Sequence, residues 1–229
     1  MKNIILDNWL SKIIGKQSYR LQLAEKNFKK QNLPKGKMFI WTKVPSGNIE
    51  KLVYFQKLGF YVVDNNIQLS LTKKMIEIKN TNVRFAEPSD EKGVRALARV
   101  AFKHNRFNFD PQISKKVACK IKEEWAGNYF SGKRGRWMVV VEYKKNIIGF
   151  LQLIRKNYKT IVIDLIAVDK KNRGKGLAKT MISYASINCL GSHEVIEVGT
   201  QIANTESLAL YAKLGFSIIS SSYVLHRHQ

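Results

Sequence analysis

A hydrophobic segment ends in a basic, glycine-containing loop that opens an amphipathic helix, and this junction constrains the fold more than any other part of the sequence. Residues 160–168 are apolar apart from Thr160 and Asp164, which is typical of a strand buried on both faces of a sheet. Apolar residues then recur at helical spacing from Leu177 to Leu190. We therefore predict a strand, a loop and a helix in this order.

The loop has the composition of an anion-binding site. Gly174 and Gly176 can adopt backbone torsions that other residues disfavour. The first N–H groups of the helix that follows have no carbonyl partner within it, and the helix dipole adds positive charge there. Arg173, Lys175 and Lys179 add mobile charge at the same point. This pattern favours a pyrophosphate site, and a lysine-rich surface turn is the alternative.

Two common phosphate-binding loops do not fit. In a P-loop, Lys179 and Thr180 would form the required pair, but the motif's glycines would then fall on Ala178 and Arg173. In a dinucleotide-binding fingerprint, Lys179 stands where glycine or alanine is needed. The spacing therefore excludes both motifs.

A second motif occupies residues 199–216 and predicts a strand end, a capped helix and a new strand. Asn204 is the expected N-cap, and Gly215 stands where a left-handed helix terminus is needed. Tyr211 lies about two helical turns after Asn204, so both project from nearly the same helix face. Tyr211 is either a functional group or a core tyrosine whose hydroxyl is hydrogen-bonded.

The same pattern occurs earlier in the chain. Residues 48–60 align with residues 204–216 without a gap and share Asn, Glu, Leu, Lys, Leu, Gly and Phe, and a β-rich tail follows each Gly-Phe pair. We interpret this as an internal repeat, with chance similarity of two amphipathic helices as the alternative. Phe55 replaces Tyr211 in the first copy, and no glycine loop precedes it. That copy is therefore expected to be a degenerate half-unit without catalytic groups.

The remaining segments predict a mixed α/β fold. A short strand is expected at 82–87, then a helix capped near Ser89 or Asp90, and a second helix that ends near Trp125. Residues 137–143 and 147–154 should pair across a turn at 144–146. We predict two domains, an N-terminal partial domain at 1–80 and a catalytic domain at 81–229.

Composition limits the partners. The formal net charge is +23, but the basic residues are spread along the chain and lack interleaved aromatics, so we expect no nucleic-acid partner. The charge disfavours a polycationic acceptor and favours an anionic one. Only two cysteines are present, and no apolar run is long enough to span a membrane, so a cytoplasmic protein without membrane insertion is expected. A homodimer is an open alternative to a monomer.

The two motifs together resemble the GCN5-related N-acetyltransferase superfamily, both in their residues and in the order of the predicted elements. Arg173, Gly176 and Ala178 match its Arg-x-x-Gly-x-Ala loop, while Asn204 and Tyr211 match its second motif. The resemblance implies acetyl-CoA as the acetyl donor and no metal. It also implies that Tyr211 protonates the departing thiolate. The cofactor-binding residues that it implies are Ile166, Ala167, Val168, Arg173, Gly174, Lys175, Gly176, Leu177, Ala178, Lys179, Asn204 and Ser207.

Shorter segments resemble one branch of that superfamily, the dTDP-fucosamine acetyltransferases. The segments are an Arg-Phe-x-x-Asp-Pro loop at Arg106 and a helix end with Trp125 and Asn128. This resemblance implies that a dTDP-linked amino-deoxysugar is the acceptor, for surface polysaccharide synthesis, with Arg106, Trp125 and Asn128 as substrate-binding residues. The alternative is that these three residues only anchor a buried loop.

The chemistry requires a base for the acceptor's ammonium group and a proton for the leaving thiolate. Asp164, on the central strand four residues before the loop region, is the candidate base, and a structural or substrate-binding carboxylate is the alternative. Direct transfer requires no enzyme nucleophile. Two other functions remain open, namely acetylation of a protein or small-molecule amine, and binding of acyl-CoA without turnover.

Overall fold

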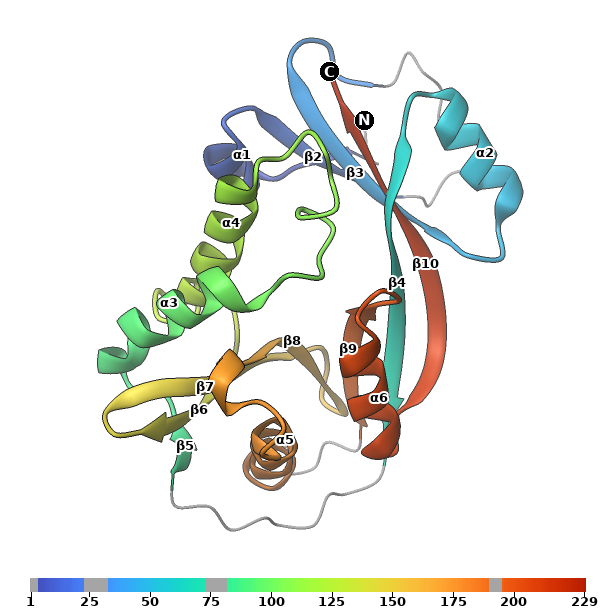
Figure 1. Cartoon of the computed structure of the whole chain (residues 1–229). Coiled ribbons are helices and arrows are strands. Elements are labelled where there is room, and N and C mark those ends of the chain that lie inside the picture. The colour runs from blue at the N-terminus through green and yellow to red at the C-terminus, as the bar shows by residue number, and fades with distance from the viewer. Residues whose placement is uncertain (1–3, 23–32, 73–81, 190–194) are drawn as a thin grey trace.

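One mixed sheet runs through the described chain. The computed structural model describes residues 4–22, 33–72, 82–189 and 195–229. Within them the strand order is β1-β2-β3-β10-β4-β9-β8-β7-β6-β5 (Figure 1). The strands are β1 (Ile4–Leu6), β2 (Gln17–Leu21), β3 (Met38–Pro45), β4 (Tyr61–Leu71), β5 (Val83–Phe85), β6 (Trp137–Tyr143), β7 (Asn146–Arg155), β8 (Thr160–Val168), β9 (Val195–Gln201) and β10 (Ser217–His228). The helices are α1 (Asn8–Ile14), α2 (Ile49–Lys57), α3 (Glu91–Ala101), α4 (Lys115–Gly127), α5 (Leu177–Asn188) and α6 (Thr205–Lys213), and short 3₁₀ turns lie at Pro88–Asp90 and Lys170–Asn172.

The predicted α/β class with a mixed sheet is confirmed. Pairs β2–β3 and β8–β9 are parallel, and the other neighbouring strands are antiparallel. Strand β8 has the predicted bounds, and α5 begins at the predicted Leu177 and ends at Asn188. The predicted hairpin joins β6 and β7 through Lys144 and Lys145, whose φ angles of +48° and +62° suit a tight two-residue turn.

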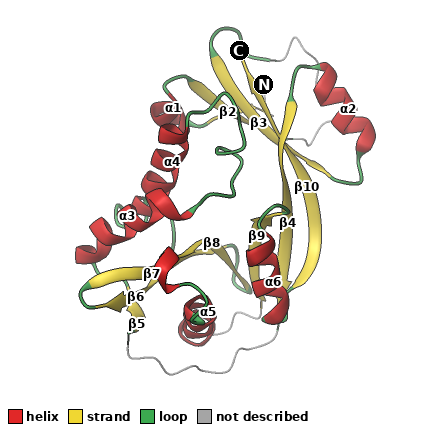
Figure 2. Cartoon of the chain, viewed as in Figure 1, coloured by secondary structure: helices red, strands yellow, loops and turns green. Residues whose placement is uncertain are grey.

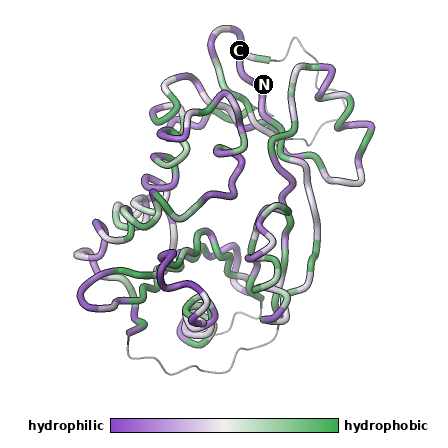
Figure 3. Tube along the Cα trace, viewed as in Figure 1, coloured by the Kyte–Doolittle hydropathy of each residue, from purple (hydrophilic) through white to green (hydrophobic). Residues whose placement is uncertain are grey.

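Helices cover both faces of the sheet around β6, β7 and β8 (Figure 2). Alternate residues of β6 face opposite sides. Val139 and Val141 pack in the same cluster as α5, whereas Met138 and Val140 pack with α3. Hydrophobic residues follow these strands, and the segment between β8 and α5 is hydrophilic (Figure 3). The buried strands therefore hold the hydrophilic loop at one edge of a rigid core.

The last strands of the two predicted domains are exchanged within the sheet. Strand β4, from the N-terminal segment, pairs with β9 and β10 of the C-terminal segment. Strand β10 in turn pairs with β3 as well as with β4. The predicted boundary at residues 80 and 81 lies outside the described residues, and the division into two domains stays a prediction.

Helices α2 and α6 end in the same way, as the repeat predicts. Phe60 donates its backbone N–H to the carbonyl of Phe55, and Phe216 donates its own to that of Tyr211, at 3.0 Å in both cases. The glycine between them has a positive φ in each copy, +85° at Gly59 and +89° at Gly215. Each helix is capped by an asparagine side chain, Asn48 or Asn204.

None of the helices in the described residues is both long enough and apolar enough to cross a membrane.

Candidate active site

Strands β8 and β9 pair only where they begin. Among the described residues, the paired positions on β8 run from Thr160 to Ile163. Strand β7 continues to pair along the other edge of β8, and β9 pairs with β4. The end of β8 therefore has one edge without a strand partner, where an extended ligand can pair as an added strand. The predicted backbone positions on this edge are Ile166, Ala167 and Val168.

The glycine loop that follows has the predicted backbone conformation. Gly174 and Gly176 have φ angles of +76° and +77°. A Cβ atom at either position would meet no atom within 4 Å, so the torsion, rather than close packing, requires glycine here. No side chain caps the N-terminus of α5. Exposed cations surround this terminus, namely Arg173, Lys175 and Lys179, and its first turn also contains the half-buried Leu177 and Ala178.

The structure brings the loop and the second motif together. Arg173 Nη1 lies 3.8 Å from Glu206 Oε2 in the first turn of α6. Asn204 caps that helix as predicted, because its Oδ1 accepts the backbone N–H of Ser207 at 3.3 Å. The Arg173–Glu206 pair is exposed and adds little stability. It nevertheless places the N-terminus of α6 beside the loop, so one anionic ligand can contact both.

Tyr211 lies inside the core and is 2% exposed. Its ring packs against Phe216 with centroids 5.3 Å apart. Burial raises the pKa of its hydroxyl above the ordinary value, so the group stays protonated at neutral pH. Tyr211 therefore carries its proton at neutral pH, but it is not one of the described residues that line the pocket between the two segments of the chain.

That pocket, about 650 Å³ in volume, lies between the N-terminal strands and the elements α4, β8 and β9. The three predicted substrate-binding residues and the predicted base all line it, and they are Arg106, Trp125, Asn128 and Asp164. Ile163 and Gly199 also line it, at the point where β8 and β9 separate. The pocket therefore opens onto the free edge of β8.

Asp164 is fully engaged in hydrogen bonds. Arg134 donates two, at 2.6 Å to Oδ2 and 2.7 Å to Oδ1. The indole of Trp125 donates at 2.8 Å, and Gln152 donates at 3.2 Å. The Asp164 side chain is only 7% exposed. This geometry favours the alternative in which Asp164 positions Trp125 and Arg134, and its assignment as the base stays a prediction.

The N-terminal segment supplies pocket residues that the sequence did not indicate. Two guanidinium groups lie over the ring of Trp41, with the Cζ of Arg106 3.7 Å and that of Arg20 5.2 Å from its centroid. The Arg106 Nη1 and Trp41 Nε1 atoms are buried and have no hydrogen-bond partner among the described residues. Burial, together with repulsion from Arg20, lowers the pKa of Arg106 to about 9, so it remains charged at neutral pH. These side chains come from separate elements, and no spacing rule connects them.

The charge of the pocket lining is unbalanced. Its six cations are Arg20, Lys43, Arg106, Lys122, Lys133 and Arg134, and its three carboxylates are Asp7, Asp64 and Asp164. Desolvation by the pocket walls and repulsion from Arg106 and Arg20 lower the pKa of Lys43 to about 8. Burial lowers the pKa of Lys122 to about 8 as well, where it lies over the Trp125 ring. A lining with excess positive charge suits an anionic ligand.

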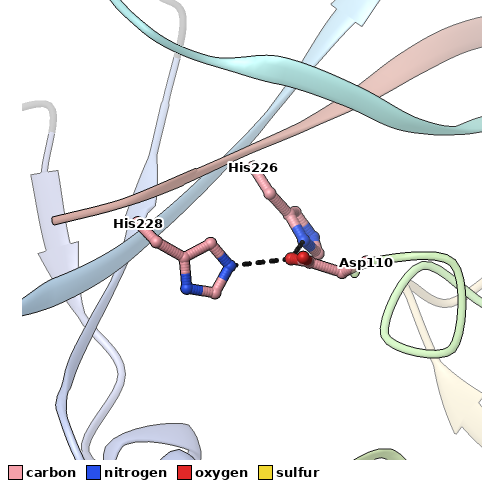
Figure 4. Close-up of side chains that lie close together, drawn as sticks. All are labelled: Asp110, His226 and His228. Carbon is pink, nitrogen blue, oxygen red and sulfur yellow. Dashed lines mark hydrogen bonds and ion pairs between the residues drawn. The ribbon is translucent and has the colours of Figure 1, made fainter. Parts of the chain in front are cut away.

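A buried carboxylate fixes the loop that carries Arg106. Asp110 Oδ2 lies 2.6 Å from His226 Nδ1 and 2.8 Å from His228 Nε2 (Figure 4). Its Oδ1 accepts the Tyr61 hydroxyl at 2.7 Å. Aspartate and two histidines are also a donor set for divalent metals. However, both imidazoles contact one oxygen, and the Lys16 ammonium lies 2.8 Å from the other ring nitrogen of His228, so a hydrogen-bond network describes this cluster better.

Comparison with known proteins agrees with this geometry. A model of the acetyltransferase (GNAT) family matches residues 98–216, just over half of the chain. The spore coat polysaccharide biosynthesis protein SpsD of Bacillus subtilis is 28% identical over 82% of this chain. The matched region covers 66% of the length of SpsD, slightly less than two thirds. A dTDP-fucosamine acetyltransferase of Escherichia coli is 24% identical over 82% of this chain and 81% of its own length. A GCN5-related N-acetyltransferase structure from Sphaerobacter thermophilus matches the fold with a TM-score of 0.61 and 12% identity, over 98% of this chain and 76% of that one.

Proposed function

The chain belongs to the acetyltransferase (GNAT) family, and from this premise we propose that it acetylates the amino group of a nucleotide-linked amino-deoxysugar. Acetyl-CoA is the donor in this family. The proposed acceptor is a dTDP-linked sugar used for surface polysaccharide. The names of two relatives, one in spore coat polysaccharide synthesis and one acting on dTDP-fucosamine, support this substrate class.

The charge of the pocket is the observation that carries the proposal. Its lining has six cations against three carboxylates. Two N–H groups, on Arg106 and Trp41, are buried without a partner among the described residues. Buried donors gain most from an acceptor that bears charge, such as a phosphate oxygen. A nucleotide-linked sugar carries a diphosphate, whereas a polyamine would be repelled.

On the donor side, the chain offers a strand edge and a cationic loop. The backbone of Ile166 and Val168 would bind the pantetheine as an added strand, and the N-terminus of α5 would bind the pyrophosphate. Arg173, Lys175 and Lys179 would neutralise its charge. This division puts the donor on the C-terminal segment and the acceptor in the pocket that both segments line.

We propose direct transfer without a covalent enzyme intermediate. The acceptor amine must lose a proton before it attacks the thioester, and Tyr211 then protonates the leaving thiolate. Burial keeps the Tyr211 hydroxyl protonated, as this role requires. Asp164 orients Trp125 and Arg134 against the acceptor through its hydrogen bonds.

A panel of acceptors tests the substrate. The protein and acetyl-CoA are incubated with dTDP-linked amino sugars, the same amino sugars without the nucleotide, and spermidine. We expect mass spectrometry to detect an added acetyl group on a nucleotide-linked sugar, with kcat/KM at least about 100-fold above that of the free sugar, because lost charge-assisted hydrogen bonds are worth several kcal/mol. Equal kcat/KM for the free sugar or for spermidine would reject the proposed substrate.

The two capping asparagines provide a matched test of the donor site. Asn204→Ala and Asn48→Ala each remove one side-chain cap and should each cost about 1 kcal/mol of stability. Only Asn204 lies beside the loop at Arg173, so only Asn204→Ala should also raise the KM for acetyl-CoA, by several-fold. Urea unfolding and steady-state kinetics measure the two effects. Equal KM values in the two variants would contradict this assignment.

A further inference from the structure

Among the described residues, two carboxylates of the pocket have no cationic hydrogen-bond partner, namely Asp64 and Asp7. Asp64 lies on β4, in the N-terminal segment, and is 7% exposed. It alternates with Asn66 and Gln68 along the strand, and all three line the pocket. Period-two alternation places these side chains on the same face of the sheet. Asp64 therefore faces the same space as Arg106 and Asp164.

The other two carboxylates of the pocket have structural roles. Asp7 caps α1 by accepting the backbone N–H of Leu10 at 2.8 Å. Asp164 accepts four hydrogen bonds, two of them from Arg134. Asp64, by contrast, accepts the backbone N–H of Asn65, and no ion pair within 4.0 Å joins it to any described residue. Asp64 is thus the pocket carboxylate that neither caps a helix nor pairs with an arginine, and it retains lone pairs that can accept a proton.

The register of the sheet places Asp64 beyond the end of β9, the strand that lies between β4 and β8. Asn66 on β4 lies opposite Gln201, the last residue of β9. Asp64 is two residues further along β4, about 7 Å by the rise of a strand. It therefore lies just past the end of β9, where β8 and β9 have already separated. An amine bound between this carboxylate and the free edge of β8 would lie between its base and the thioester.

The surroundings of Asp64 suit a proton acceptor. The charged groups that face it are Lys43 on β3, Arg106 on its loop and Lys122 on α4, while its partner on β10 is the uncharged Val224. All three cations favour the carboxylate, but burial outweighs them and raises the pKa of Asp64 to about 6. Such a group is ionised at pH 7 and is still basic enough to accept a proton. Lys43 and Lys122, with pKa values of about 8, are mostly protonated at that pH.

We propose that Asp64 is the general base of the acetyl transfer, so that the degenerate N-terminal segment supplies a catalytic group. This inference rests on the proposed function. The Asp64 carboxylate takes a proton from the acceptor ammonium, directly or through one water, and the nitrogen lone pair attacks the thioester carbonyl carbon. The C–N bond forms, the C–S bond breaks, and the thiolate takes a proton from Tyr211. Asp64 and Tyr211 then exchange protons with solvent.

The test compares three variants by the pH dependence of the rate, measured as CoA release with whichever amine of the panel is acetylated. In the wild type, kcat/KM should rise with pH to a plateau, with an apparent pKa near 6. Asp64→Asn should lower kcat by about 100-fold or more and abolish this acidic limb. Asp64→Glu should restore part of the rate together with the limb. Asp164→Asn should retain the limb, because there the base is intact.

Controls distinguish the loss of a catalytic base from a loss of structure and from a wrong choice of substrate. Asp64→Asn keeps the side-chain shape and removes a buried charge, so acetyl-CoA binding by calorimetry and thermal stability should stay near the wild-type values. The proposal is overturned if Asp64→Asn keeps the acidic limb and a kcat within threefold of the wild type. It is also overturned if the limb is lost in Asp164→Asn alone. If only an amine without a nucleotide is acetylated, the substrate proposal fails, and the Asp64 test proceeds with that amine.

Discussion

Asp110→Asn should lower the free energy of unfolding by about 3 kcal/mol, because it disrupts a buried and fully hydrogen-bonded carboxylate. Asp110 accepts hydrogen bonds from Tyr61, His226, His228 and the backbone of Gln112. An asparagine of the same size would offer one oxygen to these donors and turn an N–H group toward the others. The loop that carries Arg106 and the last strand, β10, would lose their common anchor.

Urea unfolding at pH 7 measures this loss, and Glu197→Gln is the control. Glu197 also forms an ion pair, with Lys156 at 2.9 Å, but that pair lies at the surface and should contribute at most about 1 kcal/mol. A loss for Asp110→Asn no larger than that for Glu197→Gln would contradict the anchoring role of the cluster.

The same cluster predicts how stability depends on pH. Burial lowers the pKa of His226 from 6.5 to about 4, so the folded state holds it neutral while the unfolded state takes up a proton. The stability that the folded state owes to neutral His226 is present above pH 6.5. It is lost as the pH falls from 6.5 towards 4. The hydrogen bonds hold the pKa of Asp110 far below its ordinary value, against the effect of burial, so its contribution is lost below about pH 4. Asp110→Asn should remove the loss of stability below about pH 4, because the group that takes up the proton there is gone.

Tyr211→Phe should lower kcat by about 100-fold or more and leave the KM for acetyl-CoA nearly unchanged, because it deletes only the proton that the leaving thiolate needs. The phenylalanine ring should keep the contact with Phe216, whose centroid lies 5.3 Å from that of Tyr211. Phe55, at the equivalent place in the first repeat, packs against Phe60 at the same centroid distance of 5.3 Å. The fold therefore accommodates phenylalanine at this position.

The pH profile and a thermal melt distinguish a proton donor from a packing residue. Burial raises the pKa of Tyr211 above its ordinary value, so the wild-type kcat should not decline from its deprotonation up to about pH 10. Tyr211→Phe should melt within a few degrees of the wild type. Unchanged kcat for every accepted amine would reject Tyr211 as the acid.

Local patterns in the sequence predicted the elements that hold the donor. The run at 160–168 gave β8 its bounds, and Gly174 and Gly176 do adopt positive φ angles before α5. Asn204 and Gly215 define the ends of α6, and the repeat predicted the matching cap at Asn48 and the turn at Gly59. These features depend on residues within a few positions of one another, so spacing and propensity suffice to predict them.

The acceptor pocket could be predicted only in part. Sequence resemblance picked out Arg106, Trp125 and Asn128, the position of Asp164 on the central strand picked out that residue, and all four line the pocket. The sequence did not indicate that Arg134 occupies the carboxylate of Asp164, because these two residues are thirty positions apart. The sequence also predicted that the N-terminal repeat lacks catalytic groups, and no pattern in it indicated that Asp64 lines the pocket.

The sequence by itself therefore determined the fold class, the anion loop and the two capped helices, because each is encoded by neighbouring residues. Only the tertiary structure decided which side chains share the pocket. The exchange of β4 and β10 inserts the N-terminal repeat into the sheet beside β9, and this places Asp64 just past the end of β9, where β8 and β9 have already separated. The pairing of strands 125 to 135 residues apart, as in β4 and β9, depends on packing across the whole sheet, and no local pattern specifies it.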